Sequence, residues 1–301
     1  MKKIFLSLLT IVAVFSLVLV GSQAFFSDTE TSEGNILQAG ALDLKVDNTC
    51  YYNGNACVDG HFVNTEEACS CTWQSDDLSE QDVLFSFRDL KPGDWEEDTL
   101  SFNVENDAWV CADLDLTSNL DNSITEPEDE ADALPGNNSD GTVNGDLAGE
   151  LEFIFWNDDG DNVHEVDEKV LTSGLASEVL DSARWAIADS STGRPVLGGQ
   201  TAYVGKAFCF GNLTASPLAQ SAYTGPNVDN DVDTDVDPQD GGILCDGKLV
   251  GNISQTDSLG GNVVFYAEQA RHNEGFLCNP PTPTPTQTPT PTLAPSPTGP
   301  Q

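Results

Sequence analysis

Basic residues are scarce in this 301-residue chain, which has 11 lysines and arginines against 50 aspartates and glutamates and a formal net charge of −39. A chain of that sign repels nucleic acid and anionic lipid, so neither is expected as a partner. Histidine is scarce too, with three residues in all. A zincin-type protease needs two histidines four positions apart on a helix, whereas HEVDE at 164–168 ends in glutamate. With no G-x-S-x-G motif either, we predict that the chain is not an enzyme.

Long hydrophobic runs are confined to one place, residues 4–20, and no later segment is apolar enough to cross a membrane. Two lysines precede the run, and small residues follow it at Ser22 and Ala24. This arrangement predicts a signal peptide at 1–24, cut by a signal peptidase between Ala24 and Phe25. The alternative is an uncleaved anchor. We expect a secreted protein at the cell surface or in an extracellular matrix, with no stable membrane span after cleavage.

Eight cysteines form an even set, which in an exported chain predicts disulfides. Their pairing does not follow from the sequence. Four lie together near His61, which raises zinc as an alternative, but their spacing, C-x6-C-x11-C-x-C, fits no common zinc pattern. We therefore favour a disulfide-stapled loop. The eight are Cys50, Cys57, Cys69, Cys71, Cys111, Cys209, Cys245 and Cys278.

The middle of the chain alternates apolar and polar residues over short segments, which is typical of strands with one buried face. Only residues 174–183 suggest a helix. We predict an all-β fold, a β-sandwich spanning 25–278, with acidic insertions at 48–82 (Cys-rich), 117–147 and 220–247. Residues 279–301 are rich in Pro and Thr and predict a disordered stalk. The expected strands are 41–46, 83–87, 100–104, 110–116, 150–156, 201–210 and 263–267.

The stretch NDDGDNVHEVDE at 157–168 places oxygen-bearing groups at positions 1, 3, 5, 7, 9 and 12 of an EF-hand-like loop. Hard oxygen ligands at this spacing suit structural Ca²⁺. Position 6 departs from the pattern because Asn162 stands where glycine is usual, although asparagine tolerates the left-handed backbone needed there. An acidic β-turn is the alternative. The predicted ligands are Asn157, Asp159, Asp161, the Val163 carbonyl, Glu165 and Glu168.

Three stretches in order resemble the TasA/camelysin family: AFFSDTETSEGNILQAGALDLKV (24–46), LKPGDWEEDTLSFNVEN (90–106) and DSLGGNVVFYAEQARHN (257–273). The first is similar to that family's SipW-dependent cleavage junction and following strand. Ala41 stands where threonine is commoner, and Ala108 where glycine often follows the second stretch. The resemblance covers about half of the chain and leaves out the cysteine loop and the tail.

The resemblance implies a jelly-roll-like sandwich and a structural subunit of an extracellular filament or biofilm matrix. Its partner would be itself, as a homopolymer, or other matrix components. Assembly would add the N-terminal strand of one subunit to a sheet of the next. The donor positions would be Phe25, Phe26, Ile36, Leu37, Leu42 and Leu44.

Two other functions remain open. One is a monomeric surface adhesin, stiffened by Ca²⁺ and carried on the Pro/Thr stalk. The other is a camelysin-like metalloprotease, after the activity proposed for one branch of the family.

Overall fold

The computed structural model describes residues 27–31, 42–65, 67–79, 81–132, 145–220, 223, 225–230 and 235–280. The predicted signal peptide, its junction at Ala24 and Phe25, and nearly all of the Pro/Thr tail lie outside these residues. Within the described part of the chain, no helix is long and apolar enough to span a bilayer.

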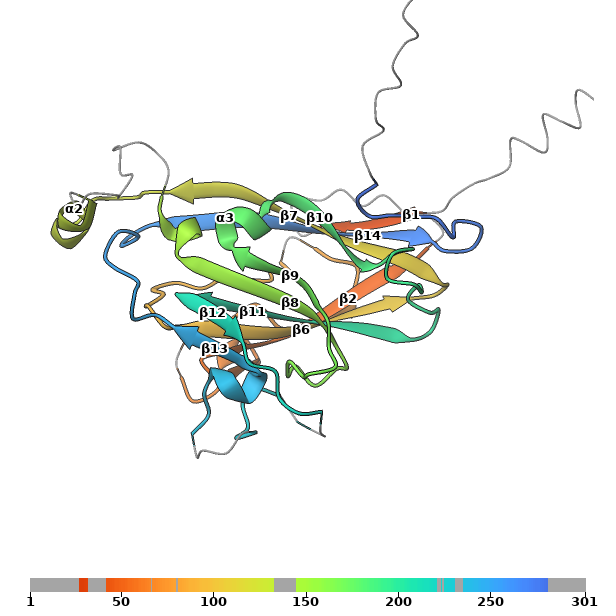
Figure 1. Ribbon diagram of the computed structural model, residues 1–301, viewed down its shortest axis with the longest axis horizontal. Helices are drawn as coiled ribbons and strands as arrows, with labels where there is room; N and C mark the ends of the chain where they lie inside the picture. The colour runs from red at the N-terminus through yellow and green to blue at the C-terminus, as the bar shows by residue number, and fades with distance from the viewer. Residues whose placement is uncertain are drawn as a thin grey trace, which may run out of the picture.

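Two antiparallel sheets face each other, which confirms the all-β sandwich (Figure 1). Jelly-roll connectivity stays a prediction. The first sheet has the order β1 (Ser27–Thr31), β14 (Ser258–Gln269), β7 (Ala108–Leu120) and β10 (Asp181–Ala188). The second has the order β4 (His61–Phe62), β3 (Asn55–Val58), β2 (Leu44–Tyr52), β6 (Trp95–Val104), β11 (Thr201–Phe210), β8 (Leu151–Asp158) and β9 (Val170–Leu175), with β5 (Trp73–Asp76) beside β2.

The core lies between the sheets and follows from the period-two alternation of the strands. Val204 and Phe208 of β11 both project into it, as do the even-numbered residues of β6 around Phe102. Phe102 meets Phe265 of β14 edge to face, with ring centroids 4.8 Å apart, so the two sheets touch through aromatic rings.

A smaller apolar cluster covers the outer face of the second sheet. Strands β12 (Asn212–Ala215) and β13 (Ile243–Asp246) pair antiparallel beside β8 and β11, and Ile243 of β13 belongs to this cluster. Trp156 is fully buried there, opposite Gly205 in the register of β8 and β11. A Cβ at Gly205 would lie 2.1 Å from the indole, so only glycine fits.

Helical structure in the described residues is limited to short pieces: α2 (Glu126–Asp132), α3 (Ala176–Val179), η1 (Leu147–Gly149) and η2 (Pro238–Gly241). The helix predicted at 174–183 is therefore mostly wrong, because β9 and β10 take its ends into the sheets. The strand predicted at 83–87 is also wrong. Leu84 is buried in the core, but its segment forms no ladder with either sheet.

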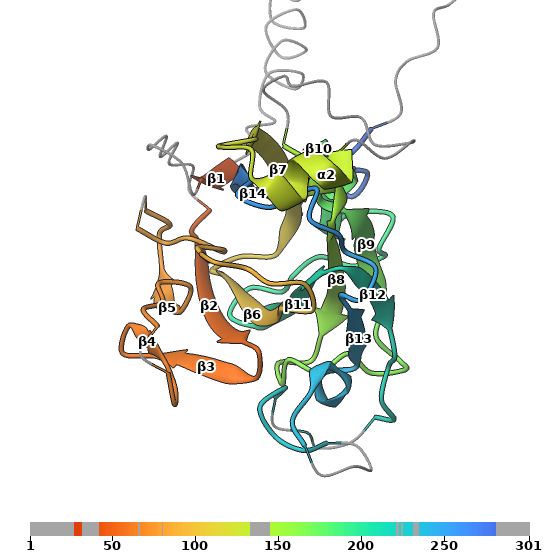
Figure 2. The same ribbon diagram turned by 90° about the vertical axis from the view of Figure 1, so that its left-hand side faces the viewer.

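All eight cysteines are paired, as predicted: Cys50–Cys71, Cys57–Cys69, Cys111–Cys278 and Cys209–Cys245. The zinc alternative is therefore not supported. Cys50–Cys71 ties the Cys-rich segment to β2, and Cys57–Cys69 closes a loop within that segment from β3. β2 runs to Tyr52 and so includes the first residues of the predicted insertion. Figure 2 shows β3, β4 and β5 beside β2. Four disulfides are typical of chains that fold in an oxidising compartment.

Candidate calcium loop and exchangeable edge strand

The acidic loop predicted at 157–168 begins where β8 ends. Asp158 closes the strand, and its carboxylate accepts hydrogen bonds from the backbone N–H groups of Gly160 and Asn162 at 3.1 and 3.2 Å. Asn162 has φ +61°, the left-handed conformation expected of it at position 6. Glycine is thus not required for the turn, and the substitution leaves the loop geometry intact.

The turn gathers carboxylates into two overlapping groups. Oxygens of Asp159, Asp161 and Glu165 lie within 4.8 Å of one another, and so do those of Asp158, Asp159 and Glu168. Asp159 belongs to both groups, so one or two cations could bridge them. The grouping of Asp159, Asp161, Glu165 and Glu168 agrees with the predicted ligand set.

That Asn157 and the Val163 carbonyl are ligands stays a prediction. Asn157 is a residue of β8, where it pairs with Val204 and its N–H donates to the Lys169 carbonyl at 2.9 Å. Val163 is buried, with its N–H bonded to an Asp161 carboxylate oxygen at 3.0 Å. The acidic groups also include Asp158, which the loop spacing does not single out.

Burial, followed by repulsion between the carboxylates, raises their pKa values. The pKa of Asp158 rises to about 7, that of Asp161 to about 6 and that of Glu168 to about 8. Buried oxygens of Asp158 and Glu168 have no hydrogen-bond partner among the described residues. A bound cation would supply both the missing partners and the opposite charge.

Glu97 lies behind the loop on the outer face of β6. It is fully buried, and neither carboxylate oxygen has a hydrogen-bond partner in the described part of the chain. Its pKa is raised well above the ordinary value, first by burial and then by repulsion from Asp158 and Asp240. No sequence pattern predicts its burial, because an acidic residue within a strand is expected to face solvent.

The histidines lie apart. His164 is buried beside Trp156, with ring centroids 5.4 Å apart, and burial lowers its pKa. His61 is exposed in β4, and His272 is exposed after β14. None of the acidic groups found among the described residues contains a histidine. That the chain is not an enzyme stays a prediction.

The N-terminal strand occupies the edge of the first sheet. β1 pairs antiparallel with β14 of its own chain, from Ser27 opposite Glu268 to Thr31 opposite Val264. It is the outermost strand of that sheet, next to β14 (Figure 1). Without β1, the backbone groups of β14 along this edge would lose their partners.

Only part of the predicted donor segment lies in the described residues. Phe25, Phe26, Ile36 and Leu37 lie outside them. Leu42 and Leu44 are buried in the core of their own chain, and β2 pairs with β6 from Leu44 onward. Their assignment to a free donor segment is therefore corrected, because these leucines hold the sandwich together and a neighbour's groove could not receive them without opening it.

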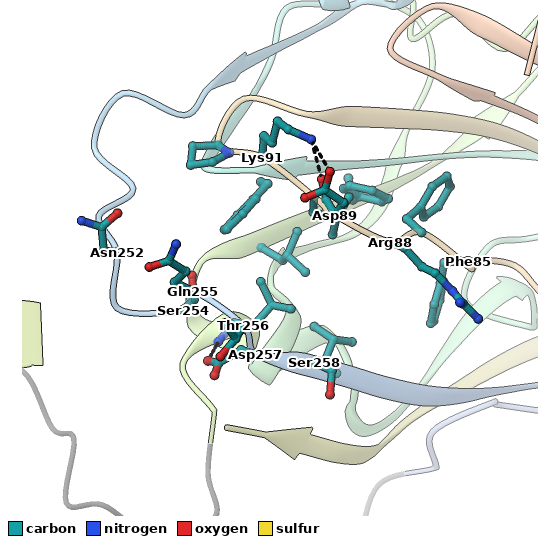
Figure 3. Close-up of a pocket in the computed structure, with 18 of the residues that line it drawn as sticks. Phe85, Arg88, Asp89, Lys91, Asn252, Ser254, Gln255, Thr256, Asp257 and Ser258 are labelled. Carbon is teal, nitrogen blue, oxygen red and sulfur yellow. Dashed lines mark hydrogen bonds and ion pairs between the residues drawn. The ribbon is translucent and has the colours of Figure 1, made fainter. Parts of the chain in front are cut away.

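A cavity of about 740 Å³ opens at one end of the sandwich, between residues 85–92 and 251–259. Its floor is aromatic, with Phe153, Phe208 and Phe210, and its rim is polar, as the side chains of Asn252, Gln255 and Thr256 show in Figure 3. Lys91 on the rim pairs with Asp89 at 2.9 Å. No local sequence pattern predicts this cavity, because its lining comes from four segments distant in sequence.

Comparison with protein-family models found no match for this chain, and comparison with curated proteins found none either. The candidate sites therefore rest on their own geometry.

Sequence reasoning also missed a buried charged cluster in the core. Lys206 of β11 lies at 2.8 Å from carboxylate oxygens of both Glu96 and Asp98 of β6, and all three side chains have no exposed surface. A signal was present: Lys206 shares its period-two face with Val204 and Phe208, so it had to point inward.

Proposed function

We propose that this protein is a secreted structural subunit of an extracellular filament or biofilm matrix, assembling by exchange of its N-terminal strand. The observation that carries the proposal is the place of β1, an edge strand that pairs only with β14 among the described strands. An antiparallel edge pairing of this kind can form equally with a second copy of the chain, because the main-chain hydrogen bonds are the same in both.

The chain length permits the exchange. Ten residues, 32–41, separate β1 from Leu42. An extended chain spans at most about 3.3–3.6 Å per residue, so ten residues reach roughly 35 Å. This is enough to carry β1 from its own sheet to the edge of an adjacent subunit. The contact is directional, head to tail, and such contacts generate open filaments when the rotation does not close.

The resemblance to TasA/camelysin proteins supports the same function, since the proposed donor begins at the junction AFFSD. Cleavage at Ala24 would free Phe25 and Phe26 to lead the strand. The export route, the filament and the family assignment are all proposals.

Calcium is proposed as a structural ion of the acidic loop. Asp158, Asp159, Asp161, Glu165 and Glu168 would hold it, and Asn162 would keep the turn. A bound ion would stiffen the end of β8 next to β11, in the second sheet, without taking part in strand exchange.

Deletion tests the proposal. Removing residues 25–35 should leave a folded monomer that forms no fibres in electron microscopy. Removing residues 281–301 is the matched control, a terminal deletion on the C-terminal side of the sandwich, and should leave assembly intact. Fibres formed by the N-terminal deletion would overturn the proposal.

A monomeric, calcium-stiffened adhesin on the Pro/Thr stalk is the second candidate, favoured by the pairing of β1 within its own chain and by the cavity in Figure 3. Sizing the mature protein at high concentration, with and without Ca²⁺, separates the two. A strict monomer under both conditions favours the adhesin. The camelysin-like protease has no comparable support from the geometry.

A further inference from the structure

The buried cluster around Lys206 brings an amine and a carboxyl group into direct contact inside the core. Lys206 and Asp98 are directly opposite in the register of β11 and β6, and Lys206 Nζ lies 2.8 Å from Asp98 Oδ2. Glu96, two residues along the same strand face, lies 2.8 Å from the same nitrogen. Reacting groups held in contact have a very high effective concentration.

Three further contacts orient the groups. The Leu84 carbonyl accepts a hydrogen bond from Lys206 Nζ at 3.1 Å, and the Phe85 ring lies 5.4 Å from the same atom. Asn48 Nδ2 donates to Asp98 Oδ2 at 2.9 Å. The sulfur of Cys50 is close to both carboxyls but is bonded to Cys71, so it takes no part.

As ions, these groups are costly in the core. A lysine ammonium and two carboxylates without solvent exposure carry a desolvation penalty that their attraction need not repay. Glu96 relieves part of it by holding a proton, since burial and then the charge of Asp98 raise its pKa well above the ordinary value. The remaining charges, on the Lys206 ammonium and the Asp98 carboxylate, would be removed if the two groups formed a neutral amide.

We propose that Lys206 Nζ and the Asp98 side chain condense into an intramolecular amide that crosslinks β11 to β6. Proton transfer from Nζ to Oδ2 within the ion pair first gives a neutral amine and a carboxylic acid. Nζ then attacks Cγ of Asp98, and the electron pair of the Cγ–Oδ1 carbonyl moves to Oδ1. Glu96 donates its proton to the Oδ2 hydroxyl, which departs as water while Oδ1 re-forms the carbonyl, and Glu96 takes a proton back from Nζ. One water leaves, and no oxidant or reductant is needed.

The mass of the purified protein tests the crosslink. After full reduction of the disulfides, the wild-type chain should weigh about 18 Da less than its sequence requires, the mass of one water. Tandem mass spectrometry should find a branched peptide joining Lys206 to Asp98. A full sequence mass with an unlinked Lys206 peptide would overturn the proposal, as would a branch to Glu96 in place of Asp98.

Variants separate chemistry from folding. Glu96→Gln keeps both reactants but removes the proton relay, so its mass deficit should disappear while its circular dichroism stays that of the wild type. Asp98→Asn should show a mass deficit of about 17 Da, because its side-chain amide releases ammonia where the aspartate releases water. Lys169→Met, at an exposed lysine, is the control and should keep the deficit of about 18 Da. A deficit that persists in Lys206→Met would also refute the assignment.

Discussion

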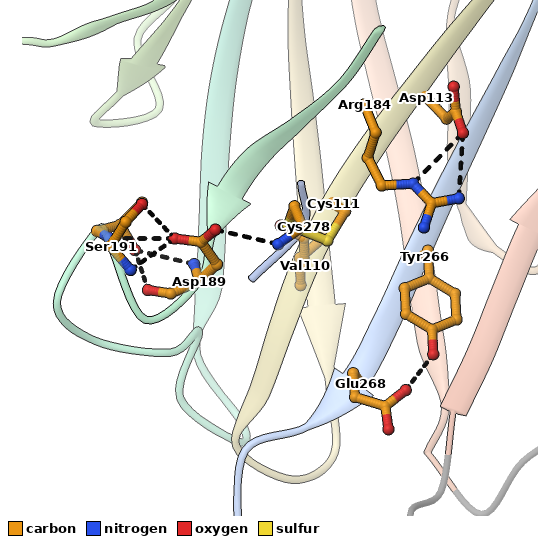
Figure 4. Close-up of a disulfide and its surroundings, with 10 residues drawn as sticks. Val110, Cys111, Asp113, Arg184, Asp189, Ser191, Tyr266, Glu268 and Cys278 are labelled. Carbon is orange, nitrogen blue, oxygen red and sulfur yellow. Dashed lines mark hydrogen bonds and ion pairs between the residues drawn. A yellow bond between two sulfur atoms is a disulfide. The ribbon is translucent and has the colours of Figure 1, made fainter. Parts of the chain in front are cut away.

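Removing the Cys111–Cys278 disulfide should destabilise the protein more than removing a disulfide that closes a short loop, such as Cys57–Cys69. Cys111 lies near the start of β7 and Cys278 lies in the segment after β14, so the bond ties that segment to an inner strand of the first sheet (Figure 4). The backbone N–H of Cys278 also donates to Asp189 at 3.1 Å, which anchors the same end beside β10.

The magnitude follows from the loop that each disulfide closes. Cys111 and Cys278 are 167 residues apart, and Cys57 and Cys69 are 12 apart. Loop-closure entropy gives about 5 kcal/mol for the long loop and about 3 kcal/mol for the short one. The Cys209–Cys245 bond shortens the long loop from within, which changes its value by only about 0.2 kcal/mol.

The assay is chemical unfolding of two double-alanine variants, Cys111→Ala with Cys278→Ala and Cys57→Ala with Cys69→Ala. Three of these four cysteines are buried and Cys69 is partly buried, so the loss of packing is similar and the difference in stability reports the loop length. We expect the first variant to be about 2 kcal/mol less stable than the second. Equal losses, or the reverse order, would refute the reasoning.

Two further predictions concern the loop and the outer cluster. With Ca²⁺ removed by a chelator, Asp158 and Glu168 keep their protons in the folded state up to about pH 7 and about pH 8, whereas the unfolded chain releases them near pH 4. The free energy of unfolding should therefore fall as the pH rises between these limits, and added Ca²⁺ should restore it. A melting temperature at pH 8 that does not change with Ca²⁺ would contradict this. Gly205→Ala should cost about 1–3 kcal/mol in unfolding experiments because its methyl group meets Trp156. Gly251→Ala, where a Cβ meets nothing within 4 Å, is the control and should change little.

The strands that the sequence predicted best are those whose alternation is uninterrupted. β11 has the predicted bounds of 201–210, β6, β7 and β14 each contain a predicted strand, and β8 covers all but the first residue of the strand predicted at 150–156. Residues 83–87 show the same alternation and still form no strand. Their apolar side chains meet the core, but the Leu84 carbonyl accepts from Lys206 instead of a neighbouring strand. Periodicity reports burial of a face and does not report where the backbone hydrogen bonds go.

The candidate sites were predictable where a single loop makes them. The spacing at 157–168 anticipated the gathering of Asp159, Asp161, Glu165 and Glu168, because ligands on one tight turn are close by construction. Asp158 was missed because it ends a strand. The Lys206 cluster was missed because it needs the pairing of two strands 110 residues apart, which no local pattern reveals.

The partner of β1 is the central question, and a cysteine trap answers it directly. Thr31 and Val264 are opposite in the register of β1 and β14. Opposite residues have Cα atoms about 4.5–5.5 Å apart, within the range that a disulfide bridges. In fibres of the variant Thr31→Cys with Val264→Cys, strand exchange predicts covalent multimers on a non-reducing gel. The control Thr31→Cys with Asn262→Cys, out of register by two residues, should give few. Fibres of the trapped variant that yield only crosslinked monomers would contradict the account.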